Sequence, residues 1–492
     1  MGGSSSKIST SAPMLGALRV QQSSYGVTIP LVYGRARVPG NLIWYGDFVA
    51  TPHTEESQSG GKGGGGVTQS QTDYTYTAAV VMAIGEGTIT GVPSVWRGKE
   101  RWSTLPNGQG PLSQLGLSLA TGADGQAEWG YLTSTHPSEA LGYSGTAVIY
   151  GATYQLTDNA EVHNHNFEVD AKLQFGGGVV DSDASQFIPD ALTSARYGAG
   201  FPASKIADLS WYASYVRALG LFLSPALLEQ REAREWVDEW CRITNSAPVW
   251  SEGKLKIIPY GDSGASGNGA TFVPDTTPQY DLTFDDFLVD SPDEEPVKVT
   301  RKSPADAYNR VTVEFADRSN QYNVSQAVAE DLRAIELYGE RPLEPLQFHS
   351  ICDSQVARTV AQLILQRQLF VLNKYSFRLG WRYSRLEPMD LVTLSDDIED
   401  GVDVGLLSRK VVRITKVTDT AGRGILVEAE DWPFGVASAT RYDHERGSGF
   451  SHEYNEEPGN VSEPVFFEAP VTGSTTGLEV LAAVSGTRSA EH

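Results

Sequence analysis

The 492-residue chain is poor in cysteine and in long apolar runs, and each shortage excludes a class of protein. Its two cysteines, Cys241 and Cys352, cannot build a disulfide framework, a multi-thiolate metal site or an iron–sulfur cluster within one chain. The longest apolar stretches, at 77–84 and 218–228, are well short of the ~20 residues that a membrane-spanning helix needs. We therefore expect two buried free thiols and no stable membrane anchoring.

Basic residues are also scarce, since 38 Lys and Arg face 61 Asp and Glu and leave a net charge of −23. Such an acidic surface repels phosphate backbones, so no specific nucleic-acid binding is expected. Glycine is abundant, with 50 residues, and the chain also has 25 prolines. Hydrophobic residues make up 40% of the chain and charged residues 20%. This composition is typical of a folded, turn-rich, multidomain chain, and the length predicts about three domains.

The first part of the chain has the pattern of a β-rich region. Short apolar runs alternate with Gly and Pro over residues 26–50, whereas residues 51–73 are rich in Gly, Ser and Glu and predict a long mobile loop. A strand at 74–84 is expected to form a hairpin with 89–97 across Gly85-Glu-Gly87, and 145–154 is expected to pair with 166–174.

A helical pattern follows. The clearest predicted helix is 226–243, where Trp236, Val237 and Trp240 lie on one apolar stripe and Ser224-Pro225 resembles a helix start. Shorter helices are predicted at 183–192 and 204–218, and a hairpin joins 247–251 to 254–259 across Glu252-Gly253. The Gly/Ser-rich stretch 261–270 is interpreted as a linker.

Strands return in the last third of the chain. Helices are predicted at 325–338 and 353–372, and from about residue 437 the chain is polar and Gly-rich, which predicts an extended segment. The expected strands are 298–301, 309–316, 375–381, 391–394, 407–418 and 424–431.

No motif predicts a catalytic, cofactor-binding or metal site. Gly261-Asp-Ser-Gly264 has the local sequence of a serine-protease nucleophile, but it lies among further Gly and Ser and lacks a matching histidine context. His163 and His165 could face one side of a strand as metal ligands, but spacing indicates no third ligand.

Two further patterns have a structural explanation as well as a functional one. The acidic runs Asp285-Asp286 and Asp293-Glu294-Glu295 could supply a glycosidase carboxylate pair, but a solvated loop is favoured. Trp236 and Trp240 could form an aromatic platform, but a helix packed on a sheet explains them with fewer assumptions. We therefore predict no enzyme activity and no cofactor.

Several short motifs follow one another along the chain in a distinctive order. They are Gly-Val-Thr-Ile-Pro-Leu-Val-Tyr-Gly at 26–34, Ala-Ile-Gly-Glu-Gly at 83–87, Phe-Glu-Val at 167–169, Arg-Tyr-Gly-Ala-Gly at 196–200, Thr-Asn-Ser-Ala at 244–247, Leu-Lys-Ile-Ile-Pro-Tyr-Gly-Asp at 255–262, Tyr-Asn-Arg-Val at 308–311 and Arg-Leu-Glu-Pro-Met-Asp at 385–390. Their order resembles that of the putative phage tail protein family, whose members form the hub of a phage tail tip. The resemblance spans about residues 26–431.

This resemblance implies an α+β, β-rich multidomain hub with two tail-tube-like β-barrel domains plus α+β domains. It implies a homotrimer that adapts a sixfold tail tube to a threefold tip and encloses the conduit for DNA ejection. The implied partners are the distal tail protein or tube ring, the tape-measure protein and the tip or fibre proteins. The location is the distal end of the tail in the virion, after assembly in the bacterial cytoplasm.

The expected domain order combines the pattern and the resemblance. It is an N-terminal arm at 1–24, a β-rich region at 25–180 with the loop 51–73, an α+β unit at 181–262, a second β-rich region at 263–436 with the helix 353–372, and a C-terminal segment at 437–492, interpreted as the start of a truncated β domain. The arm and the C-terminal segment are candidates for contacts between subunits. The alternative functions are a cell-wall- or capsule-degrading enzyme of the tip and a receptor-binding adhesin.

Overall fold

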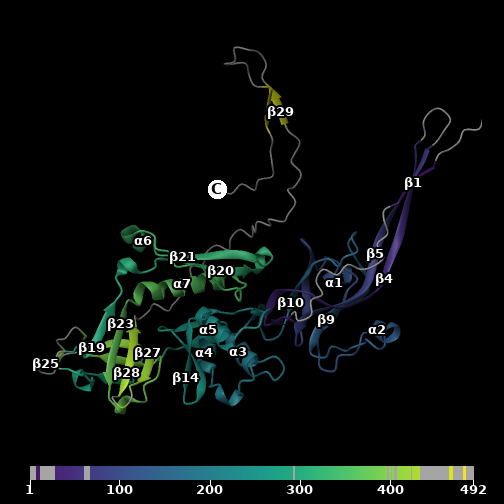
Figure 1. Ribbon diagram of the computed structural model, residues 1–492. Coiled ribbons are helices and arrows are strands. Elements are labelled where there is room, and N and C mark those ends of the chain that lie inside the picture. The colour runs from purple at the N-terminus through teal and green to yellow at the C-terminus, as the bar shows by residue number, and fades with distance from the viewer. Residues whose placement is uncertain are drawn as a thin grey trace, which may run out of the picture. The chain divides into compact units, whose positions relative to one another are not determined.

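The chain has a strand-rich α+β fold, which confirms the α+β, β-rich part of the predicted fold class (Figure 1). The computed structural model describes residues 7–11, 28–59, 67–291, 294–395, 398–399, 402–403, 407–420, 422, 424–432, 465–468 and 480–483. The chain divides into a large unit, Met1–His444, and a small one, Glu445–His492. In the small unit the described residues form one hairpin of β29 (Val465–Glu468) and β30 (Val480–Ala483); the rest of the predicted C-terminal segment lies outside the described residues.

Two sheets enclose the first core of the large unit. A five-stranded sheet contains β1 (Lys7–Ser11), β4 (Asn41–Ser59), β5 (Val67–Glu86), β8 (Ser118–Ala120) and β9 (Thr146–Gln155). A four-stranded sheet has the order β3 (Arg35–Pro39), β10 (His165–Asp170), β6 (Gly91–Arg97) and β7 (Glu100–Ser103). Side chains such as Val38, Val80, Ile149 and Phe167 pack into one core, because alternate residues of a strand point to the same face of its sheet.

The predicted loop at 51–73 is wrong, because most of it forms the outer half of a long β4–β5 hairpin. The two strands pair continuously to Ser59 and Val67, beyond the end of β9, as Figure 1 shows. The β-branched Thr residues here have good strand propensity despite their polarity. Part of the predicted N-terminal arm also joins this ribbon, since β1 pairs in parallel with β5.

Two predicted strand pairings are also wrong, although the strands themselves exist. β5 does not form a hairpin with β6, and β9 does not pair with β10; in each case the two strands belong to different sheets. Gly85-Glu-Gly87 leads the chain from one sheet to the other, where the Glu86 and Gly87 amides donate to the Pro30 and Gly145 carbonyls.

A second core joins helices from the middle of the chain to elements from its last third. It contains side chains of α3 (Ala184–Thr193), α4 (Ser210–Leu219), α5 (Ala233–Ile243) and α7 (Ser354–Phe370), together with those of β20 (Arg310–Asp317). β20 pairs with β21 (Asn323–Glu330) and β22 (Leu346–Gln347), and α7 lies against the β20–β21 pair (Figure 1). The predicted hairpin is confirmed as β14 (Ser246–Ser251) with β15 (Lys254–Pro259).

Two predicted helices are partly wrong. The helix at 226–243 begins only at Ala233, because Ala226–Leu227 forms a strand, β13, that pairs with β2 (Leu31–Val32). In the predicted helix 325–338 only α6 (Leu332–Tyr338) is helical, since the residues before it belong to β21. The predicted linker 261–270 contains β16 (Ala265–Gly267), which pairs with β17 (Ala270–Phe272).

A six-stranded sheet with its own core completes the large unit. Its order is β18 (Tyr280–Leu282), β24 (Leu391–Leu394), β27 (Lys410–Asp419), β28 (Ile425–Asp431), β23 (Asn373–Leu379) and β19 (Val297–Arg301). Phe287, Phe377, Leu394 and Val427 are among its buried side chains. Among the described residues none of the sheets closes into a barrel, so the two expected barrels are not confirmed.

Candidate functional site

The two histidines weighed as metal ligands have a structural role. His165 at the start of β10 is buried, accepts or donates a hydrogen bond with the Tyr154 hydroxyl at 3.0 Å, and its other ring nitrogen contacts the His163 carbonyl at 2.6 Å. Burial lowers the pKa of His165 to about 4. Within the described ranges no group of three or more His, Cys, Asp or Glu residues could hold a metal ion.

The Gly261-Asp-Ser-Gly264 motif is part of the helical core and not of a nucleophile site. A Cβ atom at Gly261 would lie 2.6 Å from the Tyr215 ring and 2.7 Å from the Phe272 ring, so only glycine fits this close approach. Asp262 is 2% exposed, and its negative charge acts on the buried Arg413 guanidinium.

The acidic runs contact arginines on β23 and in the turn that follows it. Asp286 accepts from its own turn at Thr283 and forms an ion pair with Arg382, and Glu294 contacts Arg378 at 3.2 Å. Asp293 lies outside the described residues. These neutralising contacts support the interpretation of the runs as structural.

Trp240 and both cysteines are core residues. Trp240 is 1% exposed and packs edge-on against Phe187, whereas Trp236 stacks on Trp240 at the core's rim. Cys241 and Cys352 are free and buried, as predicted. Burial raises the pKa of the Cys352 thiol to about 12 and also raises the pKa of Cys241, which keeps both thiols protonated.

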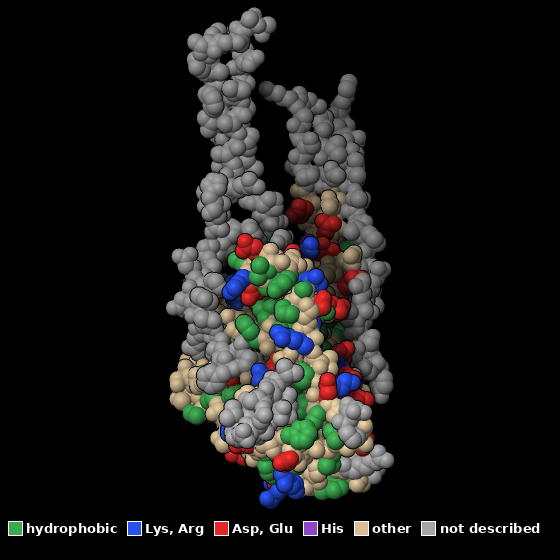
Figure 2. Space-filling model, turned by 90° about the vertical axis from the view of Figure 1, so that its left-hand side faces the viewer, with side chains coloured by type: hydrophobic (Ala, Val, Ile, Leu, Met, Phe, Trp, Pro, Cys, Tyr) green, Lys and Arg blue, Asp and Glu red, His purple; other side chains and the backbone are tan. Residues whose placement is uncertain are grey.

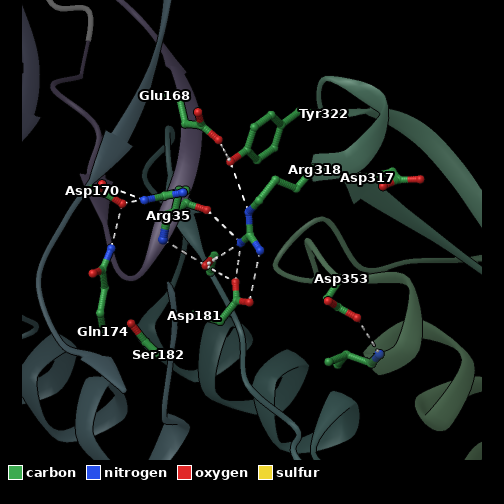
Figure 3. Close-up of polar contacts among 12 residues, drawn as sticks. Arg35, Glu168, Asp170, Gln174, Asp181, Ser182, Asp317, Arg318, Tyr322 and Asp353 are labelled. Carbon is green, nitrogen blue, oxygen red and sulfur yellow. Dashed lines mark hydrogen bonds and ion pairs between the residues drawn. The ribbon is translucent and has the colours of Figure 1, made fainter. Parts of the chain in front are cut away.

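The most developed polar cluster in the structure is centred on Arg318, and we call it the Arg318 junction (Figure 3). Its guanidinium forms a two-pronged ion pair with Asp181, with Nη1 at 3.2 Å from Oδ2 and Nη2 on Oδ1. Nη2 also donates to the Arg35 carbonyl at 3.1 Å, and Ser224 donates to Asp181 at 2.5 Å. One side chain thereby connects residues that are 283 and 137 positions away in sequence.

The junction continues into the four-stranded sheet. The Tyr322 hydroxyl donates to Glu168 on β10 at 2.8 Å, and Arg35 on β3 forms a bidentate pair with Asp170 at 2.6 and 2.8 Å. These contacts fix β3 and β10 against the turn that joins β20 to β21.

The electrostatics of the junction favour its ionised form. Burial alone would lower the pKa of Arg318, but the hydrogen bond and negative charge of Asp181 outweigh it and raise that pKa. Burial and the neighbouring Glu168 charge raise the pKa of Tyr322, so its hydroxyl keeps the proton that it donates. The cluster is therefore built to hold chain segments together.

A second polar cluster joins the helical core to the six-stranded sheet. Arg367 on α7 contacts Glu430 on β28 at 3.0 Å, and the Tyr260 ring lies 3.8 Å from Arg367 and 5.1 Å from Arg413. Arg413 donates to the Tyr260 carbonyl at 3.2 Å, and burial lowers its pKa to about 10. Both clusters therefore fix sheets to the helical core.

A cleft of about 880 Å³ opens beside the Arg318 junction. Its lining comes from β3, from Asn166 on β10, from residues 224–239, and from the β20–β22 sheet with the turn that follows it. No sequence motif points to this cleft or to the junction, because their residues are far apart in sequence. The local signal at Ser224-Pro225 has the pattern of a helix start.

The surface carries charges of both signs. Figure 2 shows Asp and Glu interspersed with Lys, Arg and hydrophobic side chains on the visible face of the described residues. The described part of the chain contains no helix long and apolar enough to cross a membrane.

Comparison with solved structures shows a shared fold. A chain from the virion of a native gene transfer agent particle matches with a TM-score of 0.55 and 16% identity, over 87% of this chain and 91% of that one. A prophage tail protein from Listeria monocytogenes EGD-e (TM-score 0.28, 10% identity, 72% and 84% coverage) and a prophage tail protein from Shewanella oneidensis (0.30, 12%, 81% and 97%) are more distant. No curated protein sequence matches the chain.

The sequence comparison identifies a family directly. Residues 232–417 match the model of the family described as putative phage tail protein. This segment contains the Thr244–Ala247 motif, the 255–262 motif and both later motifs on which the predicted resemblance rests. The predicted resemblance to the putative phage tail protein family is thus confirmed by a direct match over residues 232–417.

Proposed function

We propose that this chain is a structural protein of a phage-type tail, namely the central hub at the distal end, and that it has no catalytic activity. The observation that carries the proposal is the family match over residues 232–417. The shared fold with a gene transfer agent virion chain, which extends over most of both chains, supports it.

The internal construction suits a protein whose parts must stay in place under mechanical force. Three large cores are linked by partly buried ion pairs and hydrogen bonds, which resist sliding of one sheet against another because each charge would lose its partner. In contrast, none of the motifs weighed for catalysis forms a reactive arrangement among the described residues.

In this proposal three copies form a ring that adapts the sixfold tube to a threefold tip. The two β-rich regions, 25–180 and 263–436, supply two tube-like units per copy, with the α+β unit 181–262 between them. The separate cores of the first two sheets and of the six-stranded sheet support two such units. Phe284, Val299 and Trp381 support assembly, since they are large apolar side chains 54%, 44% and 49% exposed near the six-stranded sheet.

The proposed partners are the distal tail protein or tube ring, the tape-measure protein and the tip or fibre proteins. DNA passes through the lumen without specific binding, and the net charge of −23 supports this because phosphates would be repelled. The N-terminal arm and the C-terminal segment 437–492 are proposed to reach neighbouring subunits.

Gold-labelled antibody against the chain, applied to purified particles, tests the location. Label at the free end of the tail, with a cryo-EM reconstruction that shows three copies around the axis, is the expected result. Label along the tube, or six copies with one tube-like unit each, would refute the hub. Clearing of peptidoglycan or capsule by the purified chain would instead favour the enzyme, and binding to host cells would favour the adhesin.

A further inference from the structure

The cleft beside the Arg318 junction exposes a strand edge. The segment 224–227 covers β2 and the start of β3: β13 pairs with β2, and the Tyr33 amide donates to the Pro225 carbonyl at 3.0 Å. This cover ends at Arg35, whose amide donates to the Ser224 hydroxyl at 3.0 Å. Beyond Arg35, β10 is the strand partner that the described residues provide for β3.

The bonding pattern of β3 directs further backbone groups into the cleft. The Arg35 amide and carbonyl both bond away from β10, to Ser224 and to Arg318. Along an antiparallel strand, residues whose amide and carbonyl point toward one neighbour alternate with residues whose amide and carbonyl point the other way. Two residues after Arg35, the amide and carbonyl of Arg37 therefore also point away from β10. Arg37 lines the cleft, so an extended chain segment could pair with it there.

The Arg37 side chain adds a positive charge to this edge. Its Nη1 donates to the Gln321 carbonyl at 2.9 Å and its guanidinium lies 4.3 Å from the Trp96 ring centre. Both partners are uncharged, and no ion pair joins Arg37 to a carboxylate among the described residues. Burial removes part of the water around the Arg37 guanidinium and thereby lowers the pKa of Arg37. A carboxylate that entered the cleft would compensate this partly desolvated charge.

The other charged side chains that line the cleft already have partners of opposite charge. Arg231 lies 4.3 Å from the Trp236 ring and contacts Glu239 at 3.1 Å and Glu229 at 3.9 Å. The mouth is apolar: Leu228 is 44% exposed and Val324 59% exposed, and both line the cleft. A segment that combines an acidic side chain with small apolar ones therefore fits best.

We propose that this cleft receives an acidic, extended segment of a second copy of the chain, which adds a strand to β3 and places a carboxylate at Arg37. Charge complementarity supports this occupant, because 61 acidic residues make every other copy rich in carboxylates. The inference rests on the proposed homotrimer and names one of its contacts.

Site-directed photo-crosslinking of the full-length chain tests the contact. p-Benzoylphenylalanine in place of Val324 should give covalently joined chains, and peptide sequencing should identify an acidic segment as the crosslinked partner. Arg37→Gln should lower the crosslinking yield about tenfold, whereas Arg37→Lys, which keeps the charge, should retain most of it. The yield should also fall as salt is raised.

The oligomeric state, measured by light scattering, separates this inference from the proposed function. A trimer that gives no crosslink between copies from position 324 would refute the contact and leave the hub intact. Crosslinks that Arg37→Gln leaves unchanged would refute the role of the charge. A chain that stays monomeric at all concentrations would overturn both the trimer and the contact.

Discussion

Replacing Arg318 should loosen the contact between the four-stranded sheet and the helical core. Arg318→Met keeps most of the side-chain volume but leaves Asp181 without its ionic partner, although the side chain of Asp181 is only 9% exposed. Removal of one member of a buried ion pair costs about 3–5 kcal/mol, because the remaining charge is uncompensated. This is a large share of the ~5–15 kcal/mol that stabilises a typical domain.

Hydrogen exchange at amides beside the junction provides the measurement. The Ser182 amide donates to the Leu223 carbonyl at 2.7 Å and the Ser224 amide to the Ser350 carbonyl at 2.8 Å. If the junction opens as a unit, a loss of about 3 kcal/mol speeds exchange of both amides about 150-fold. Amides of the six-stranded sheet should keep their protection, which distinguishes local loosening from global unfolding.

Arg234 on α5 offers a matched control, since it pairs with Asp238 at 3.5 Å while its side chain is 87% exposed. Arg234→Met should cost less than about 0.5 kcal/mol, because exposed pairs contribute little. The reasoning would be refuted if amide exchange at Ser182 and Ser224 accelerated less than threefold in Arg318→Met. It would also be refuted if Arg234→Met accelerated exchange at these amides equally.

Three further predictions concern buried groups. Because His165 is less easily protonated in the folded chain than in the unfolded one, stability should fall by up to about 3 kcal/mol as the pH drops from about 6.5 to 4; His165→Gln should remove this part of the pH dependence of unfolding. Gly261→Ala should cost about 1–3 kcal/mol in thermal or urea unfolding, whereas Gly264→Ala, with its closest contact at 3.6 Å, should cost much less. Iodoacetamide at pH 8 should leave Cys241 and Cys352 unmodified in the native chain and label both in urea; rapid native labelling would contradict their burial.

The sequence predicts elements well where local pattern and final environment agree. The helix expected at 353–372 is α7, Ser354–Phe370, because Asp353 caps its first turn and its apolar residues repeat at helical spacing. The hairpin around Glu252-Gly253 is found in the expected register, because its turn residues adopt the positive φ angles that such turns need.

The errors arise where long-range pairing outweighs local pattern. Residues 226–227 have a helix-like sequence but pair with β2, almost 200 positions earlier, and Ser224 is held by Asp181 instead of capping a helix. The outer β4–β5 hairpin is too polar to be recognised as strands, since its pairing depends on backbone hydrogen bonds and not on a buried face. The Arg318 junction could not be predicted for the same reason, and the domain boundaries remain predictions.

The make-up of the helical core has a consequence for biosynthesis. Leu31 and Tyr33 share this core with Leu363 and Leu365, so it cannot be completed until nearly three-quarters of the polypeptide has emerged from the ribosome. Contacts between such distant residues form slowly, because the intervening chain must first be brought together. Nascent chains that are shorter than this would leave the apolar faces of α3, α4 and α5 open to solvent, so chaperone occupancy should end only after α7 has been translated.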